Sequence, residues 1–223
     1  KDKKNKKTIY HFIIDKSGSM HGSETQTIAG FNTNLKTVQD LEIEFKEQEY
    51  AVYLTFFNDQ VSPIIQNSKA SSVNFLSPIS YIPSGSTALL DAIGKSIYDI
   101  KSIYGPEIEQ DLASIVLIII TDGQENASRF YTYHDIARMI KELDATERWT
   151  FSFLGADLDA IHTSKMLNIR NENVMSFSKE NYAGMMNNVN ESMREYSKTK
   201  AEGTTKKDIF DIFKNKDIRN KES

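Results

Sequence analysis

Two short, almost continuously apolar runs constrain the fold of this chain more than any other feature. The first covers residues 9–14 (IYHFII) and the second covers residues 114–120 (SIVLIII). Both are rich in β-branched or aromatic residues and stop at turn residues, which is typical of buried β-strands. Near-continuous apolarity is typical of parallel strands that are covered on both faces. Because such strands alternate with amphipathic helical segments, we predict a doubly wound α/β sheet with helices on both faces.

Each apolar run ends abruptly at a carboxylate. The first run leads into Asp15-x-Ser17-x-Ser19, and the second leads through one threonine into Asp122. If the extended geometry continues briefly past the first strand, Asp15, Ser17 and Ser19 point the same way. In doubly wound sheets, ligands lie outside the carboxyl ends of strands where the strand order reverses. Carboxylate and hydroxyl oxygens without His or Cys suit a hard divalent cation such as Mg²⁺.

A loop between the two runs completes a recognisable set of motifs. Residues 83–89 (PSGSTAL) turn into a helix and contain Thr87. In order and spacing, the three segments resemble the von Willebrand factor A (vWA) family, over roughly residues 8–196. The resemblance implies an open, mostly parallel sheet and a metal-ion-dependent adhesion site (MIDAS). The residues that match this metal site are Asp15, Ser17, Ser19, Thr87 and Asp122.

Two further stretches indicate which vWA proteins this chain resembles most. Residues 15–32 (DKSGSMHGSETQTIAGFN) and 153–160 (FLGADLDA) resemble bacterial and phage-encoded vWA proteins most. The resemblance implies a protein-binding module whose metal, Mg²⁺ or else Mn²⁺ or Ca²⁺, captures an Asp or Glu of a partner protein. Charge balance agrees with this interpretation, since two carboxylates only neutralise a divalent cation and hydroxyls add no charge. Mg²⁺ also tends to keep exchangeable waters.

Two other functions stay open. One is a Mg²⁺-dependent phosphoryl-transfer enzyme, but a haloacid dehalogenase-type phosphatase needs a second Asp where this chain has Ser17. The chain also lacks a Gly-rich phosphate loop, and its four His show no zinc-ligand spacing. We therefore expect no enzyme activity. The other alternative is a structural assembly subunit with a vestigial metal site.

Composition excludes several classes of protein. The net charge of −4 argues against a general nucleic-acid binder, and the absence of Cys excludes disulfides and thiolate metal sites. No apolar run approaches the ~20 residues of a membrane span, and the basic start is no convincing signal peptide. We therefore expect a cytoplasmic protein.

The chain in order predicts about six strands with one antiparallel edge strand. The edge strand, residues 61–65, follows residues 50–57 through a tight Asn58-Asp59 turn. Ser86 or Thr87 is expected to cap the helix that follows the central loop. Residues flanking the motifs, among them Met20 and Glu125, are expected on the surface around the metal. We predict a basic leader (1–7), a vWA domain (8–196) and a charged, flexible tail (197–223), whose apolar segment 209–213 (IFDIF) could dock a partner.

Overall fold

The computed structural model describes residues 7–178 and 181–203 and confirms the predicted α/β class. Six strands form one sheet in the order β3-β2-β1-β4-β5-β6. β3 is antiparallel to β2, whereas every other neighbouring pair is parallel. The strands are β1 (Lys7–Asp15), β2 (Glu49–Phe57), β3 (Val61–Lys69), β4 (Ala113–Thr121), β5 (Trp149–Ala156) and β6 (Val174–Phe177).

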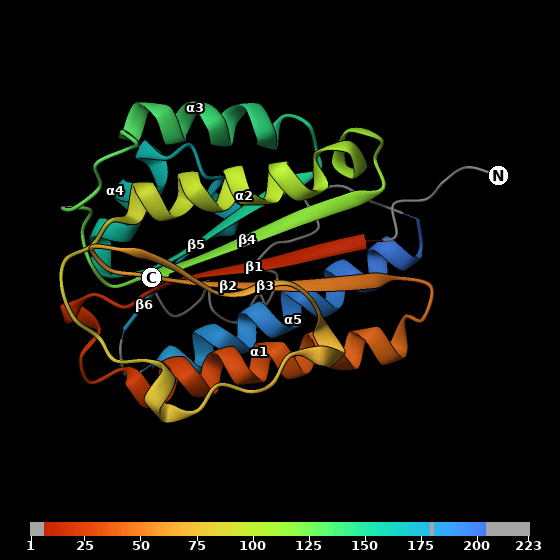
Figure 1. Cartoon of the computed structure of the whole chain (residues 1–223), viewed down its shortest axis with the longest axis horizontal. Coiled ribbons are helices and arrows are strands. Elements are labelled where there is room, and N and C mark those ends of the chain that lie inside the picture. Colours follow the sequence, from red (N-terminus) through yellow and green to blue (C-terminus); the bar gives the residue numbers. More distant parts are fainter. Residues whose placement is uncertain (1–6, 179–180, 204–223) are drawn as a thin grey trace, which may run out of the picture.

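Helices cover both faces of this sheet (Figure 1). Helices α1 (Glu24–Glu44) and α5 (Tyr182–Ala201) lie on one face, while α2 (Leu89–Glu109) and α3 (Tyr133–Asp144) lie on the other. Helix α4 (Asp157–Met166) contacts β5 and β6. The order of the strands reverses beside β1, because α1 leads from β1 to β2 on one side while β4 lies on the other. Ligands of such sheets bind at this type of switch point.

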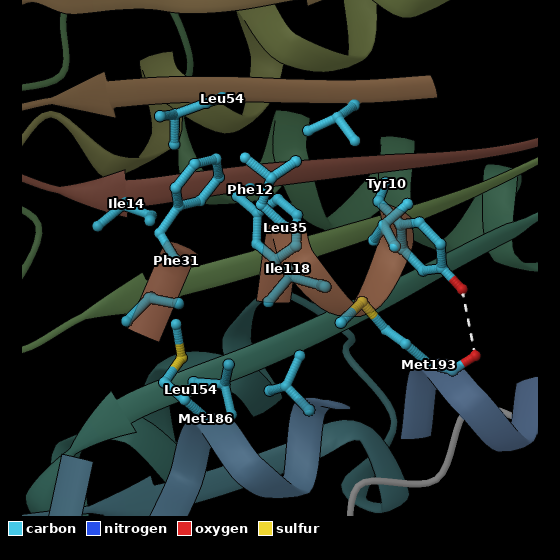
Figure 2. Packing of buried hydrophobic residues seen from close by; sticks show 14 of the residues in the cluster. Tyr10, Phe12, Ile14, Phe31, Leu35, Leu54, Ile118, Leu154, Met186 and Met193 are labelled. Atoms are coloured by element: carbon cyan, nitrogen blue, oxygen red, sulfur yellow. Dashed lines mark hydrogen bonds between the residues drawn. The ribbon is translucent and has the colours of Figure 1, made fainter. Parts of the chain in front are cut away.

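Strand β1 lies in the middle of the core. Its side chains alternate, so that Tyr10, Phe12 and Ile14 pack toward α1 and α5, while Ile9 and Ile13 pack toward α2. Figure 2 shows Phe12 and Ile14 next to residues of α1, with methionines of α5 closing the cluster. Burial on both faces explains why this run is apolar at nearly every position.

The predicted hairpin is confirmed. The turn after Phe57 leads directly into β3, and Pro63 pairs with Thr55 in this edge strand. An edge strand tolerates proline because one side of it needs no ladder hydrogen bonds. β3 extends to Lys69, beyond the predicted end at residue 65, because its outer part continues to pair with Ala51 and Val52.

Helix α5 continues past the predicted start of the tail at residue 197. It ends at Ala201, and Lys200 in its last turn is buried. Met185, Met186 and Met193 of this helix are buried in the core. The apolar segment 209–213 lies outside the described residues. Among the described residues, no helix is long and apolar enough to cross a membrane.

Candidate metal site

Asp15 ends the central strand in a fully buried position. Its Oδ1 accepts a hydrogen bond from the Ser17 backbone N–H at 2.6 Å, and its Oδ2 accepts one from Thr121 Oγ1 at 2.6 Å. The Tyr81 hydroxyl donates to the backbone carbonyl of Asp15. Ser17 and Thr121 thus fix the carboxylate at the carboxyl edge of the sheet, and Tyr81 fixes the backbone that carries it.

The other predicted side chains lie around this carboxylate. Ser17 Oγ and Ser19 Oγ are 3.0 Å apart, and Ser19 Oγ donates to Asp122 Oδ1 at 2.6 Å. A methyl group placed on Gly123 would lie 2.9 Å from Thr87 Oγ1, 3.1 Å from Ser19 Oγ and 3.4 Å from Asp15 Oδ2. These three oxygens therefore surround one small space beside Gly123. We call the whole set the oxygen cluster: Asp15, Ser17, Ser19, Thr87 and Asp122.

The predicted cap of helix α2 is wrong, and the reason explains how Thr87 comes to line the cluster. The N-cap residue is Ala88, whose side chain caps nothing. Instead, the Leu90 N–H donates to Glu125 Oε2 at 3.0 Å and the Asp91 N–H donates to Ser128 Oγ at 3.0 Å. Because a distant loop satisfies these donors of the first turn, the Thr87 hydroxyl is available to face Gly123.

The loop after β4 also holds the backbone of Thr87. Asn126 Oδ1 accepts from the Thr87 N–H at 2.8 Å, while the Asn126 and Ala127 N–H groups donate to the Thr87 carbonyl. Glu125 was predicted on the surface around the metal, but it is only half-exposed and its carboxylate binds the loop and the start of α2. Asn126 is exposed and positions Thr87 from the same loop. Met20 was predicted on the surface too, but it is buried in the core. Sequence patterns alone do not show which loop residues turn inward.

The loop that precedes α2 pairs with the first motif. The Ser84 N–H donates to the Lys16 carbonyl at 2.9 Å, and the Gly18 N–H donates to the Gly85 carbonyl at 3.0 Å. Residues 84–85 therefore run beside residues 16–18 at the carboxyl edge. This pairing brings Thr87, 70 positions or so downstream, beside Ser19 through backbone hydrogen bonds.

The electrostatics of the cluster favour a cation. Burial raises the pKa of Asp15, and the nearby charge of Asp122 raises it further, while hydrogen bonds from Thr121 and Ser17 oppose the shift. Ser19 is exposed and Asp122 is half-exposed, so the cluster opens to solvent on their side. No three His, Cys, Asp or Glu residues form a metal-binding group within residues 7–178 and 181–203. A cation here would therefore need the hydroxyls as well as the two carboxylates.

A comparison with protein families identifies the family of the domain. The family model described as von Willebrand factor type A domain matches residues 11–195. The chain belongs to this family. The match includes Asp15, Thr87 and Asp122, which lie on three different segments of the vWA domain. No curated protein is similar enough in sequence to match the chain.

Solved structures share the vWA fold with this chain. Proximal thread matrix protein 1 from the mussel byssus, solved with a zinc-occupied MIDAS motif, has a TM-score of 0.55 and 14% identity over 82% of this chain and 44% of its own. The manganese-loaded TRAP protein of Plasmodium vivax has a TM-score of 0.56 and 14% identity, covering 81% of this chain and 72% of its own.

A bacterial domain matches over nearly its whole length. The vWF domain of the type V pili tip protein Mfa5 from Porphyromonas gingivalis has a TM-score of 0.59 and 10% identity, covering 84% of this chain and 95% of its own. The chain spans less than half of the mussel protein's structure. At these identities the structures establish the fold alone.

Proposed function

We propose that this vWA domain is a divalent-cation-dependent protein-binding module. In this proposal the oxygen cluster holds Mg²⁺, with Mn²⁺ or Ca²⁺ as alternatives, and the cation binds an Asp or Glu carboxylate of a partner protein. One observation carries the proposal: oxygens of Asp15, Ser19 and Thr87 surround the same space beside Gly123. Mg²⁺ and Ca²⁺ prefer oxygen ligands, and Mg²⁺ keeps some of its waters.

The residues of the cluster have distinct tasks in this proposal. Thr121 and the Ser17 backbone orient the Asp15 carboxylate, and Ser19 orients Asp122. Ser17, Ser19 and Thr87 supply oxygens without adding negative charge. Two carboxylates neutralise the divalent cation without giving the site an excess of negative charge, so the cation can still bind an oxygen of a third carboxylate from a partner. The exposed side at Ser19 leaves a path for this partner residue.

Relatives support a cation as the bound group. The mussel protein was solved with zinc in its MIDAS motif, and the Plasmodium protein was solved with manganese. Both metals are divalent, which matches the two carboxylates and three hydroxyls of the cluster. The choice of Mg²⁺ for this chain rests on its all-oxygen ligands and on the common availability of that ion.

We infer that the domain binds rather than catalyses. His11 is a base by type, but it is buried in the core with Nε2 2.9 Å from Thr55 Oγ1, and burial lowers its pKa to about 3. It therefore serves the packing of the sheet. Phosphoryl transfer, the alternative function, needs a general base, and we identify none among the described residues of the cluster. The cytoplasmic location stays a prediction, since the similar structures include a pilus adhesin.

Affinity capture tests this function. The immobilised wild-type domain is incubated with an extract of the source cells in millimolar MgCl₂, and bound proteins are eluted with EDTA. We expect EDTA to release a specific set of proteins that the Asp122→Ala variant does not capture. The Asp40→Ala variant, which removes a surface carboxylate paired with Lys36, is the matched control and should capture the same set as wild type. Capture that persists in EDTA and with Asp122→Ala would refute the proposal.

A further inference from the structure

A groove of ≈ 740 Å³ lies directly beside the oxygen cluster. Three segments line it: the turn after β2, the first turns of α2 and the end of the loop between β4 and α3. Its volume is typical of sites that take up a side chain or a small ligand. Ala88 belongs to the groove, and Thr87, one residue earlier, belongs to the oxygen cluster. The groove and the cluster therefore meet at residues 87–88.

The loop after β4 connects the two sites a second time. It begins with Asp122 and Gly123 at the cluster and ends with Phe130 and Tyr131 at the groove. The Asp91 carboxylate holds the end of this loop, because it accepts hydrogen bonds from the backbone N–H groups of residues 129, 130 and 131 at 2.8–3.0 Å. These hydrogen bonds fix the part of the groove wall that residues 130 and 131 form.

Aromatic side chains dominate the exposed surface of the groove. Phe130 is 84% exposed and Tyr98 is 66% exposed, which is unusual for such large apolar groups. The Tyr131 ring packs on α2 at Gly94, where a Cβ atom would lie 2.5 Å from the ring. Gly94 is therefore required for the ring to lie this close to the helix.

Two of the three charged groups that line the groove, Asp91 and Lys95, are paired within the chain, while Asp59 is exposed at the turn after β2. Asp91 accepts the three backbone hydrogen bonds of the loop, and Lys95 Nζ binds both carboxylate oxygens of Asp99 at 2.9 and 2.7 Å. The surface left for a partner is consequently apolar and aromatic along α2 and the end of the loop, at Tyr98 and Phe130. Aromatic groups of this kind carry much of the binding energy of protein interfaces.

We propose that this groove binds a large apolar side chain of the same partner segment that gives its carboxylate to the metal. The inference rests on the proposed function. The groove follows α2 from Ala88 to Tyr98, a distance of about 15 Å along the helix axis. An extended peptide covers this distance in about five residues, so the apolar residue lies within about five positions of the acid. The partner motif is an acid with a Leu, Ile, Phe, Tyr or Trp nearby.

Selection from a library of random dodecapeptides tests this motif. The wild-type domain is screened in millimolar MgCl₂, beside the Tyr98→Ser/Phe130→Ser double variant and Asp122→Ala. Both replaced aromatic side chains are exposed, so the double variant should fold normally. We expect wild type to enrich peptides with an acid and a large apolar residue at a fixed offset. The double variant should still enrich the acid but lose the apolar preference, and Asp122→Ala should lose the acid.

Affinities of one enriched peptide make the test quantitative. Replacing its apolar residue with Ser should weaken binding to wild type at least about tenfold, but less than about twofold to the double variant. The Ile43→Ser variant is the control, because Ile43 is 68% exposed on α1 and lies outside the groove. It should bind like wild type.

Several outcomes would overturn the inference. If wild type selects the acid without an apolar preference, or if the double variant keeps the same preference, the groove does not bind the partner while the metal site stands. Apolar peptides selected without an acid and retained in EDTA would refute the metal-dependent function. Enrichment of nothing would refute both. If the wild-type domain dimerises in solution and the double variant does not, the groove is an interface between copies of this chain.

Discussion

The two ends of strand β1 each hold a buried ionisable group, and the surroundings of the two groups differ. At the amino end, the Lys200 ammonium lies against the strand and donates to the Lys7 carbonyl at 2.6 Å and Thr8 Oγ1 at 2.8 Å, with Ser114 Oγ at 3.5 Å. At the carboxyl end, the Asp15 carboxylate is also hydrogen-bonded, but it lies near a second carboxylate, that of Asp122.

The difference separates a structural charge from a binding charge. Oxygen atoms of the chain itself surround Lys200, so its end of the sheet is complete without any other group. Like charges meet near Asp15, and burial together with Asp122 raises its pKa. A bound divalent cation would relieve that repulsion, as the proposed function requires. We therefore propose that the carboxyl end of β1 is the binding end and that the amino end is structural.

The largest expected effect is the loss of metal-dependent stability when the carboxyl end of β1 alone is changed. Asp15→Asn keeps the shape of the side chain but removes its charge. At a Mg²⁺ concentration 100 times its Kd, wild type should gain about 2.7 kcal/mol of unfolding free energy, and the variant should gain almost none. Without metal, the variant should be at least as stable as wild type, since one of two like charges is gone. Urea unfolding with and without MgCl₂ measures both values.

Asp99→Asn is the matched control for that experiment. Asp99 pairs with Lys95 on the surface of α2, so its removal should leave the gain from Mg²⁺ unchanged. Equal gains for wild type and Asp15→Asn would mean that the carboxyl end of β1 is as complete without a cation as the amino end.

A second substitution fills the space of the proposed metal site with a methyl group and leaves the charges of the site unchanged. The methyl group of Gly123→Ala would occupy the space between Thr87, Ser19 and Asp15. We expect the affinity for Mn²⁺ to fall at least about tenfold, with little loss of stability, because the contacted atoms lie at the ends of side chains. Isothermal titration calorimetry measures the affinity.

Gly105→Ala provides the control for the added methyl group. Gly105 lies in α2 with no other atoms near the position of a new Cβ. This variant should be slightly more stable than wild type and bind Mn²⁺ equally well. Unchanged affinity in Gly123→Ala would place the cation elsewhere.

The third prediction concerns the structural end. Burial lowers the pKa of Lys200 to about 7 in the folded protein, whereas an unfolded chain keeps the ordinary value of 10.5. Between these values the unfolded state binds more protons than the folded state, so stability rises with pH. Between pH 7 and 9, wild type should gain about 1–3 kcal/mol relative to Lys200→Met. Urea unfolding across this pH range tests the slope.

Lys198→Met serves as the comparison, since Lys198 is exposed on the same helix. Its pH dependence should follow that of wild type. If Lys200→Met also follows wild type, the ammonium is solvated and the amino end of β1 is more open than its hydrogen bonds indicate.

The smallest expected effect concerns the loop after β4, which binds the first turn of α2 and holds the backbone of Thr87. Ser128→Ala removes the acceptor for the Asp91 N–H and should cost about 1 kcal/mol of stability. Thr132→Ala removes the capping box of α3 and should cost a similar amount. Only Ser128→Ala should also weaken Mn²⁺ binding, by about threefold, because the loop no longer holds Thr87 firmly. Equal Mn²⁺ affinities would mean that the loop supports the helix but not the site.

Much of the fold follows from the order of local patterns. The runs at 9–14 and 114–120 are apolar at nearly every position because helices cover both faces of their strands. The tight turn at Asn58 predicted the antiparallel edge correctly. The start of α2 could not be predicted in the same way, because Glu125 and Ser128 come from a loop more than 30 positions downstream.

By itself, the sequence determined the class of sheet, its edge hairpin and the three segments that carry Asp15, Thr87 and Asp122, because burial and turn formation depend on neighbouring residues. Only the tertiary structure decided that oxygens of Asp15, Ser19 and Thr87 meet beside Gly123 and that an aromatic groove continues from them along α2. Both depend on hydrogen bonds between distant segments, such as those from residues 84 and 18 to their partners across the carboxyl edge. Local residue patterns do not predict which backbone groups of distant segments will form hydrogen bonds with each other.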